Sequence, residues 1–378
     1  MPDSDAARLL IADDQPDVLE ALRLLLAREN FALQLVTTPR ALIDQVTAST
    51  WDAVLMDLNY SRDTTSGEEG LQLLSQIRSA QRDLPIVVMT AWGNIELAVA
   101  AMRAGAQSFV QKPWDNRSLI QILEREVADG RGARARSEHH AREQRDALLI
   151  QQTLMPATLP ATEHFDVVGA WRPAGTLGGD TYDAFLFSPD VIGLSIADIA
   201  GKGLPAALLM SSLQAAVRAF AHDSSPPQSV CASVNRLLCG QMIAGRFATH
   251  VYMRLDARRG ELAYANAGHN PPLLVRAGGH IDALGSSGTV LGVFPETEYR
   301  GAVVPLERGD RLLLYTDGVT ESRNRAGEEY GEERLAAALS RNRHLPAAEL
   351  HRAVLDEVTQ FAVDGFEDDT TLLAVAVK

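Results

Sequence analysis

Residues 178–211 read GGDTYDAFLFSPDVIGLSIADIAGKGLPAALLMS, with an aspartate at the edge of each of two apolar, strand-like runs. Asp180 follows two glycines, and Asp198 precedes a turn at 201–203 that opens an apolar helix. Divalent cations such as Mg²⁺ take hard oxygen ligands, and carboxylates at strand ends beside glycine turns supply them. The stretch therefore predicts part of a cation site.

Further acidic positions occur late in the chain. Asp317 stands in YTDGVTES, and Asp368 and Asp369 stand together in EDDTTLL. If these side chains meet Asp180 and Asp198, each pair about 5 Å apart repels by roughly 1 to 3 kcal/mol. Because such a cluster is tolerable only around bound cations, we expect the acids to share one metal site.

Length, charge and cysteine usage exclude several classes of protein. A chain of 378 residues is long enough for two domains, each with its own core. The net charge of −14 argues against nucleic acid as the main partner, because binding to phosphates requires a basic face. Cys231 and Cys239 lack metal-ligand spacing and are interpreted as small apolar residues in a reducing compartment. The acidic N-terminus has no secretory signal and no apolar run reaches about 18 residues, so we expect a cytoplasmic protein without a membrane segment.

Residues 1–128 have the pattern of an α/β domain with a doubly wound, parallel, five-stranded sheet. Short apolar runs alternate there with amphipathic helices. The expected strands are 8–12, 31–36, 53–57, 85–90 and 108–112. Apolar residues recur at helical spacing between them, at Val18, Leu22 and Leu25 and again at Ile95, Val99 and Met102.

Polar residues mark the carboxyl ends of these strands, where open parallel sheets carry their functional crevice. They are Asp13, Asp14, Asp57, Thr90 and Lys112. Singly, each has an ordinary alternative, such as an acidic loop or a surface lysine before proline. Together, three carboxylates, a hydroxyl and an ammonium at one edge of a sheet indicate a functional site.

With these motifs, residues 8–128 resemble a response-regulator receiver domain. The resemblance implies that a sensor histidine kinase supplies a phosphoryl group to Asp57, and that Mg²⁺ offsets the charge on the transferring oxygens. The implied Mg²⁺ ligands are Asp13, Asp14, Asp57 and the backbone carbonyl of Asn59, and the implied switch residues are Thr90, Phe109 and Lys112. The loop after Asp57 departs from the family, because it is longer than usual and lacks the usual proline.

Residues 129–159 are predicted to form a helical linker. The sequence ADGRGARAR at 128–136 breaks the helical pattern with two glycines and a basic cluster. An apolar stripe follows, at Ala147, Leu148, Ile150, Leu154 and Met155. The linker is either a solvated spacer or a signalling helix that pairs with its copy in a homodimer, which would cover the stripe.

Residues 160–378 change character, because strands and helices are grouped in blocks. Such blocks predict an α+β sandwich of two antiparallel sheets flanked by helix layers. Hairpins are expected to turn at 259–260 and 278–279, and a helix pair is expected at 204–221 and 228–243. We expect His269 to stabilise a turn and not to contact substrate, since one isolated histidine is weak evidence for a site.

Five motifs in this half are similar to those of the metal-dependent, PPM-type protein serine/threonine phosphatases, in their sporulation and stress-response branch. The motifs are PAGTLGGDTYD, ADIAGKGLPAAL, ANAGHNPPLL, YTDGVTES and DDTTL. The resemblance implies that two Mn²⁺ or Mg²⁺ ions activate a water for in-line attack on phosphoserine or phosphothreonine. The implied ligands are Asp180, Asp198, Asp317 and Asp368, with the backbone carbonyl of Ile199. Asp369 is the alternative to Asp368.

The two resemblances together predict a two-component regulator whose receiver controls a phosphatase. In this branch, the implied protein substrate is a phosphorylated anti-sigma-factor antagonist. Lys202 stands where the family usually has a histidine, and we expect it to bias which phosphate enters. The alternative is a non-catalytic adaptor that binds a partner through the phosphatase fold; missing metal ligands would favour it, and all four acids are present.

Overall fold

The computed structural model describes residues 6–60, 68–90, 95–242, 245–363 and 365–378. It divides into two compact units, residues 1–142 and 143–378, with the division inside the predicted linker. None of the described helices is both long enough and apolar enough to cross a bilayer.

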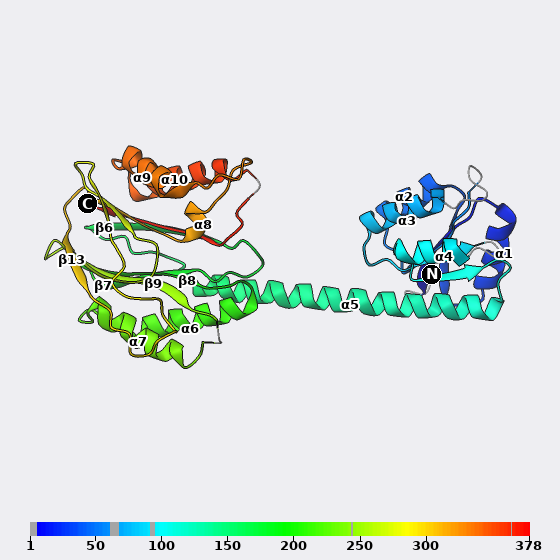
Figure 1. Ribbon diagram of the computed structural model, residues 1–378, viewed down its shortest axis with the longest axis horizontal. Helices are drawn as coiled ribbons and strands as arrows, with labels where there is room; N and C mark the ends of the chain where they lie inside the picture. Colours follow the sequence, from blue (N-terminus) through cyan, green and yellow to red (C-terminus); the bar gives the residue numbers. More distant parts are fainter. Residues whose placement is uncertain (1–5, 61–67, 91–94, 243–244, 364) are drawn as a thin grey trace. The chain divides into compact units, whose positions relative to one another are not determined.

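The first unit is the predicted parallel five-stranded sheet with helices on both faces (Figure 1). The strands run in the order β2-β1-β3-β4-β5. They are β1 (Ala7–Ala12), β2 (Phe31–Val36), β3 (Ala53–Asp57), β4 (Ile86–Thr90) and β5 (Ser108–Gln111). The helices are α1 (Pro16–Leu26), α2 (Pro39–Ala48), α3 (Glu68–Ala80), α4 (Ile95–Arg103) and α5 (Asn116–Leu154).

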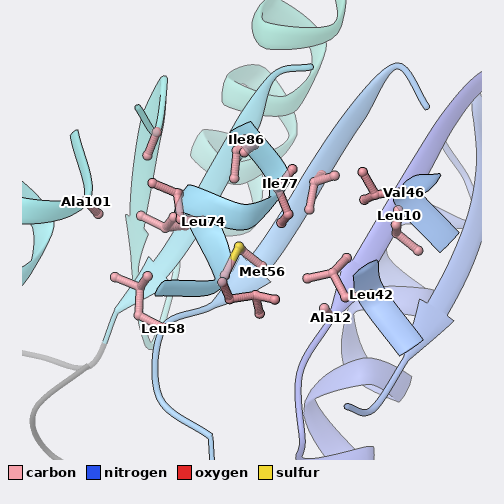
Figure 2. Close-up of a cluster of buried hydrophobic side chains, with 14 of the residues drawn as sticks. Leu10, Ala12, Leu42, Val46, Met56, Leu58, Leu74, Ile77, Ile86 and Ala101 are labelled. Atoms are coloured by element: carbon pink, nitrogen blue, oxygen red, sulfur yellow. The ribbon is translucent and has the colours of Figure 1, made fainter. Parts of the chain in front are cut away.

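Successive strand residues point to opposite sides of the sheet, so apolar side chains lie on both faces. Helices cover each face and bury these side chains. On one face, Leu10 and Met56 pack with Leu42 of α2 and Ile77 of α3 (Figure 2). On the other face, Leu9 packs with residues of α1 and α5. Continuous apolar strands of this kind are typical of parallel sheets covered by helices. Because the strands are parallel, their carboxyl ends all lie at the same edge of the sheet, where such folds carry their functional site.

Helix α4 forms where it was predicted, but two of the apolar residues that indicated it are exposed. Val99 and Met102 are exposed, whereas Leu97 and Ala101 are buried. The sequence IELAVAAMR is apolar on nearly every side, so its periodicity does not select an inward face. The side chain of Ile95 lies outside the part of the chain that the structure describes, and so do residues 61–67 of the long loop predicted after Asp57.

The structure is helical at 128–136, where we predicted a break, and α5 continues through both glycines. Arg131 Nη2 lies 2.9 Å from Asp52 Oδ2, and Arg134 donates to the Trp51 carbonyl at 2.7 Å. The backbone of Gly130 lies so close to the Pro85 ring that a Cβ would overlap it. Two arginines of the basic cluster, Arg131 and Arg134, are therefore packed against the first unit, whereas Arg136 is exposed.

We expect Gly130→Ala to lower the free energy of unfolding of the first unit by about 1–3 kcal/mol. Overpacking against Pro85 should outweigh the helix-propensity gain of about 1 kcal/mol. Gly132→Ala is the matched control, because its Cβ would meet only the flexible end of Arg136, and it should be neutral or stabilising. Urea denaturation, with hydrogen exchange of the β3 amides as a local probe, measures both variants. A stabilised Gly130→Ala protein would contradict close packing at this position.

The second unit is the predicted sandwich of two antiparallel sheets, with strand orders β13-β10-β9-β8-β7 and β12-β11-β14-β15-β6 (Figure 1). Its strands are β6 (Phe165–Arg172), β7 (Thr181–Ser188), β8 (Val191–Ile199), β9 (Ala248–Asp256), β10 (Glu261–Ala267), β11 (Leu273–Val275), β12 (Ile281–Ala283), β13 (Ala302–Pro305), β14 (Arg311–Tyr315) and β15 (Thr370–Val377). Its helices are α6 (Leu204–Phe220), α7 (Pro227–Cys239), α8 (Asp317–Thr320), α9 (Gly331–Asn342) and α10 (Ala347–Phe361).

Helices cover the outer face of each sheet, so the second unit has four layers. Figure 1 shows α6 and α7 against one sheet and α9 and α10 against the other. The alternation of β8 explains this arrangement, because Leu194 and Ile196 join the core between the sheets while Ala197 and Ile199 join the core beneath α6.

The C-terminal end of α5 belongs to the second unit. Leu154 and Met155, from the predicted apolar stripe, pack against its cores. The buried Gln151 side chain exchanges hydrogen bonds with the backbone of Gly178, donating to the carbonyl at 2.6 Å and accepting from the N–H at 3.2 Å. Part of the stripe is thus covered within the chain, while Ile150 is exposed. The homodimer stays a prediction.

Candidate functional site

In the first unit, the carboxyl ends of β1, β3 and β5 bring predicted site residues together. Carboxylate oxygens of Asp13, Asp14 and Asp57 lie within 4.8 Å of one another. Lys112 Nζ lies 2.7 Å from Asp13 Oδ2 and 3.2 Å from Asp57 Oδ2. Asp14 Oδ1 is buried and has no hydrogen-bond partner among the residues that the structure describes. An all-oxygen donor set with an unpartnered carboxylate atom fits a hard cation such as Mg²⁺.

Asp57 has the environment that a nucleophilic carboxylate requires. Burial raises its pKa to about 6, against the lowering effect of the Lys112 ammonium. The carboxyl group is therefore mostly ionised at neutral pH. Of the other residues predicted here, Thr90 is buried at the end of β4 and Phe109 is about half exposed. Asn59 Oδ1 is buried and finds no hydrogen-bond partner within the described part of the chain. Their roles in the switch stay predictions.

In the second unit, the four predicted metal ligands come from both sheets. Asp180 directly precedes β7 and Asp198 lies in β8; the pairing of Thr181 with Ala197 sets these two acids opposite each other. Asp317 follows β14 and Asp368 precedes β15. These two strands are neighbours in the second sheet, the one that does not contain β7 and β8. The acids therefore gather at one end of the sandwich.

Their charges act on one another. Burial and then the Asp198 carboxylate raise the pKa of Asp180 well above its usual range. Burial, followed by Asp317 and Asp368, raises the pKa of Asp198, and burial followed by Asp368 raises that of Asp317. Fully or partly buried carboxylates whose mutual repulsion opposes their ionisation have the chemistry of a site for divalent cations. The metal-ligand assignment stays a prediction.

Two threonines that the sequence analysis did not identify hold Asp180 in place. Thr316 Oγ1 and Thr371 Oγ1 each donate a hydrogen bond to Asp180 Oδ2 at 2.6 Å. Both threonines are buried, at the ends of the adjacent strands β14 and β15. Their signal in the sequence is a hydroxyl residue at the end of an apolar strand, next to an acidic motif.

The structure distinguishes Asp368 from Asp369. Asp369 is 6% exposed, and its carboxylate accepts hydrogen bonds from the backbone N–H groups of Ala174 at 2.8 Å and Gly179 at 2.5 Å. The Asp368 side chain is 40% exposed and lies 3.1 Å from Lys202 Nζ. Asp369 thus joins backbone segments, and Asp368 is the carboxylate left available for a cation.

We expect the replacement of Asp369 and the replacement of Asp368 to have different effects on stability and on Mn²⁺ binding. Asp369→Asn replaces an acceptor with a donor opposite buried N–H groups, so it should cost about 1–3 kcal/mol of stability. Asp368→Asn should melt at or above the wild-type temperature in EDTA, because the Asp368 charge repels Asp198 and Asp317, but it should lose most of the stabilisation that Mn²⁺ provides. Thermal unfolding with and without Mn²⁺ measures both effects. The opposite pattern would make Asp369 the ligand.

His269 lies in a buried network of hydrogen bonds. Its Nδ1 is 2.7 Å from Thr249 Oγ1, and its backbone N–H donates to Asn266 Oδ1 at 2.8 Å. Burial lowers the pKa of His269 to about 4, so the imidazole is neutral. These contacts agree with the turn-stabilising role expected from the sequence.

An aspartate site on a parallel sheet, followed by a carboxylate cluster at one end of a four-layer sandwich, defines a response regulator with a phosphatase output domain. Known families agree with this class. The profile of Stage II sporulation protein E (SpoIIE) matches residues 188–378, and that of the response regulator receiver domain matches residues 9–124. The chain belongs to the SpoIIE family and carries a receiver domain before its phosphatase domain.

Similar proteins include two curated relatives and one solved structure. Phosphoserine phosphatase RsbU of Bacillus subtilis is 30% identical over 237 residues, which cover 61% of this chain and 68% of RsbU. Protein IcfG of Synechocystis is 28% identical over 258 residues, covering 60% of this chain but only 40% of IcfG. The crystal structure of the RsbU and RsbW domains of Rv1364c from Mycobacterium tuberculosis has a TM-score of 0.54 at 28% identity, covering 60% of this chain and 63% of that one. The second unit is thus a protein serine/threonine phosphatase domain.

Proposed function

We propose that this chain is a two-component response regulator that hydrolyses phosphoserine or phosphothreonine on a protein substrate, under the control of phosphorylation at Asp57. The observation that carries the proposal is the convergence of Asp180, Asp198, Asp317 and Asp368 from both sheets of a SpoIIE-family domain. The similarity to a protein named phosphoserine phosphatase supports the type of substrate.

In this proposal the four acids hold two Mn²⁺ or Mg²⁺ ions, with help from the backbone carbonyl of Ile199. When bound, such ions offset the charge of a phosphoryl group and lower the pKa of a coordinated water, which makes it a nucleophile near neutral pH. Other residues of the chain hold these carboxylates in position. Thr316 and Thr371 fix Asp180, and the backbone hydrogen bonds of Asp369 fix the segment that carries Asp368.

The receiver supplies the control. Asp57 attacks the phosphorus atom of the donor as a carboxylate, and the donor's leaving group departs from the opposite side. Lys112, which already contacts Asp57, neutralises an oxygen of the transferred group, and Thr90 offers a hydroxyl. Mg²⁺ held by Asp13 and Asp14 offsets the remaining charge. A sensor histidine kinase is the proposed donor.

The protein substrate and the assembly belong to the same proposal. We expect the substrate to be a phosphorylated anti-sigma-factor antagonist, as in the branch that the motifs resemble. A homodimer would cover Leu149 and Ile150, which are exposed on α5. Light scattering before and after addition of a phosphate analogue tests the dimer.

The test of the main proposal is hydrolysis of a phosphoserine peptide by the full chain. Release of phosphate should require Mn²⁺ or Mg²⁺, stop in EDTA and resume when the metal is restored. Turnover should also change when a small acyl phosphate is added. A full chain that folds and binds Mn²⁺ but releases no phosphate would favour the non-catalytic adaptor.

A further inference from the structure

A small pocket opens beside the acid cluster of the second unit. Its volume is about 180 Å³. This equals roughly six water molecules at about 30 Å³ each, so a phosphoryl group fits. The pocket is lined by Lys202, Gly318, Glu321, Ser322, Arg323, Glu367 and Asp368.

The positively charged ammonium group of Lys202 contacts the acidic residues of this pocket. Its Nζ lies 3.1 Å from Asp368 Oδ2 and donates to the Glu367 carbonyl at 2.7 Å. The pocket's other cation, Arg323, is paired with Glu329 at 2.9 Å. The side chain of Lys202 is 59% exposed, so it is free to reorient, and its backbone sits in the turn that follows Asp198.

The charge of the pocket explains why a lysine ammonium that can change partners would help a phosphate group to bind there. Three acidic residues, Glu321, Glu367 and Asp368, and two basic residues line the pocket, so its lining carries a net negative charge that repels a phosphate dianion. When Asp368 takes up a divalent cation, the ammonium loses its carboxylate partner. It then remains beside the place where negative charge must enter.

Lysine is rare in this chain, which makes its positions informative. Of the 35 lysines and arginines, only Lys112, Lys202 and Lys378 are lysines. Lys112 already lies at the Asp57 site, where phosphoryl chemistry is expected. A lysine presents a compact point charge on a flexible stem, which suits a phosphate that arrives and leaves, whereas arginine favours fixed bidentate pairs.

We propose that Lys202 is a phosphate-binding residue of the phosphatase: its ammonium leaves Asp368 when that carboxylate binds a cation, and it then binds a phosphoryl oxygen of the phosphoserine substrate. This inference rests on the proposed function and adds a residue for substrate binding. Lys202 acts on the oxygens that do not leave, and no bond to it is made or broken.

The test compares Lys202→Met with wild type in the full chain. The KM for a phosphoserine peptide and the inhibition constant of inorganic phosphate should each rise at least tenfold, about the loss expected for one charged hydrogen bond. Mn²⁺ binding, measured by calorimetry, should be unchanged or tighter, because a competitor for Asp368 has gone. Lys202→Arg, which keeps the charge, should restore part of the phosphate affinity.

Lys378→Met is the matched control, because the Lys378 ammonium donates only to the Thr162 carbonyl, at 3.0 Å, among the described side-chain contacts, and its replacement should change none of these constants. If Lys202→Met leaves phosphate inhibition and KM unchanged while Mn²⁺ binds more tightly, Lys202 is only a counterion of the empty acids and the inference is overturned. If wild type releases no phosphate, the proposed function fails by itself. Calorimetric binding of inorganic phosphate to the Mn²⁺-loaded proteins would then still decide the role of Lys202.

Discussion

Asp198→Asn should reduce Mn²⁺-dependent hydrolysis at least about 100-fold, because even residues that only support a metal ligand are worth tenfold to 100-fold. Asp198 lies opposite Asp180 across β7 and β8, and the charges of Asp317 and Asp368 act on it, so its loss disturbs the whole cluster. Initial rates of phosphate release from a phosphoserine peptide measure the effect. Unchanged turnover would remove the acid cluster from the chemistry.

The same variant should be more stable than wild type when metal is absent. Burial and neighbouring acids raise the pKa of Asp198 in the folded state above its value in the unfolded chain. Such a carboxyl costs stability once the pH rises above the unfolded value, and each pKa unit is worth about 1.4 kcal/mol. In EDTA at pH 7.5, Asp198→Asn should therefore melt at a higher temperature, and Mn²⁺ should add little. Lower stability in EDTA would contradict mutual repulsion.

Asp183→Asn is the matched control for this experiment. Asp183 is a buried aspartate on β7, close in sequence to Asp180, but its carboxylate is paired with Arg218 Nε at 2.6 Å. Its replacement should lower stability, because a buried partner is lost, while Mn²⁺-dependent turnover per folded molecule persists. A loss of turnover equal to that of Asp198→Asn would point to general damage to the sandwich.

Asp57→Asn should abolish both phosphorylation by a small acyl phosphate and the response of the phosphatase to it. The amide cannot attack phosphorus as a carboxylate does, and Lys112 loses one of its two anionic partners. Phosphate-affinity electrophoresis measures phosphorylation, and the ratio of peptide hydrolysis with and without the donor measures the response. Asp17→Asn, at an exposed position in α1, should leave both intact. A response that persists in Asp57→Asn would place the control elsewhere.

The sequence identified those features that depend on strand ends. Asp13, Asp57 and Lys112 each follow or end an apolar run, and the topology of a parallel sheet requires such positions to meet at one edge. Asp180 and Asp198 could be paired for a similar reason, since each lies at the edge of a strand beside a glycine turn. In both units, the order of strands and helices along the sequence is therefore enough to predict which of these residues lie near one another.

Features that depend on packing between distant segments could not be predicted. Glycines at 130 and 132 look alike in the sequence, but only Gly130 touches Pro85, and the arginines beside it find Asp52 in a different part of the chain. The same holds for Asp369, whose partners Ala174 and Gly179 lie nearly two hundred residues away. A local pattern shows neither contact, because both depend on the finished fold.

The scarcity of lysine gives this protein a built-in chemical reporter. Apart from the terminal amine, an acetylating reagent would find three amino groups, and two of them lie against Asp57 and Asp368. Protection of one peptide would therefore follow events at the receiver, and protection of another would follow events at the phosphatase. Mass spectrometry of a single labelled sample could track input and output together.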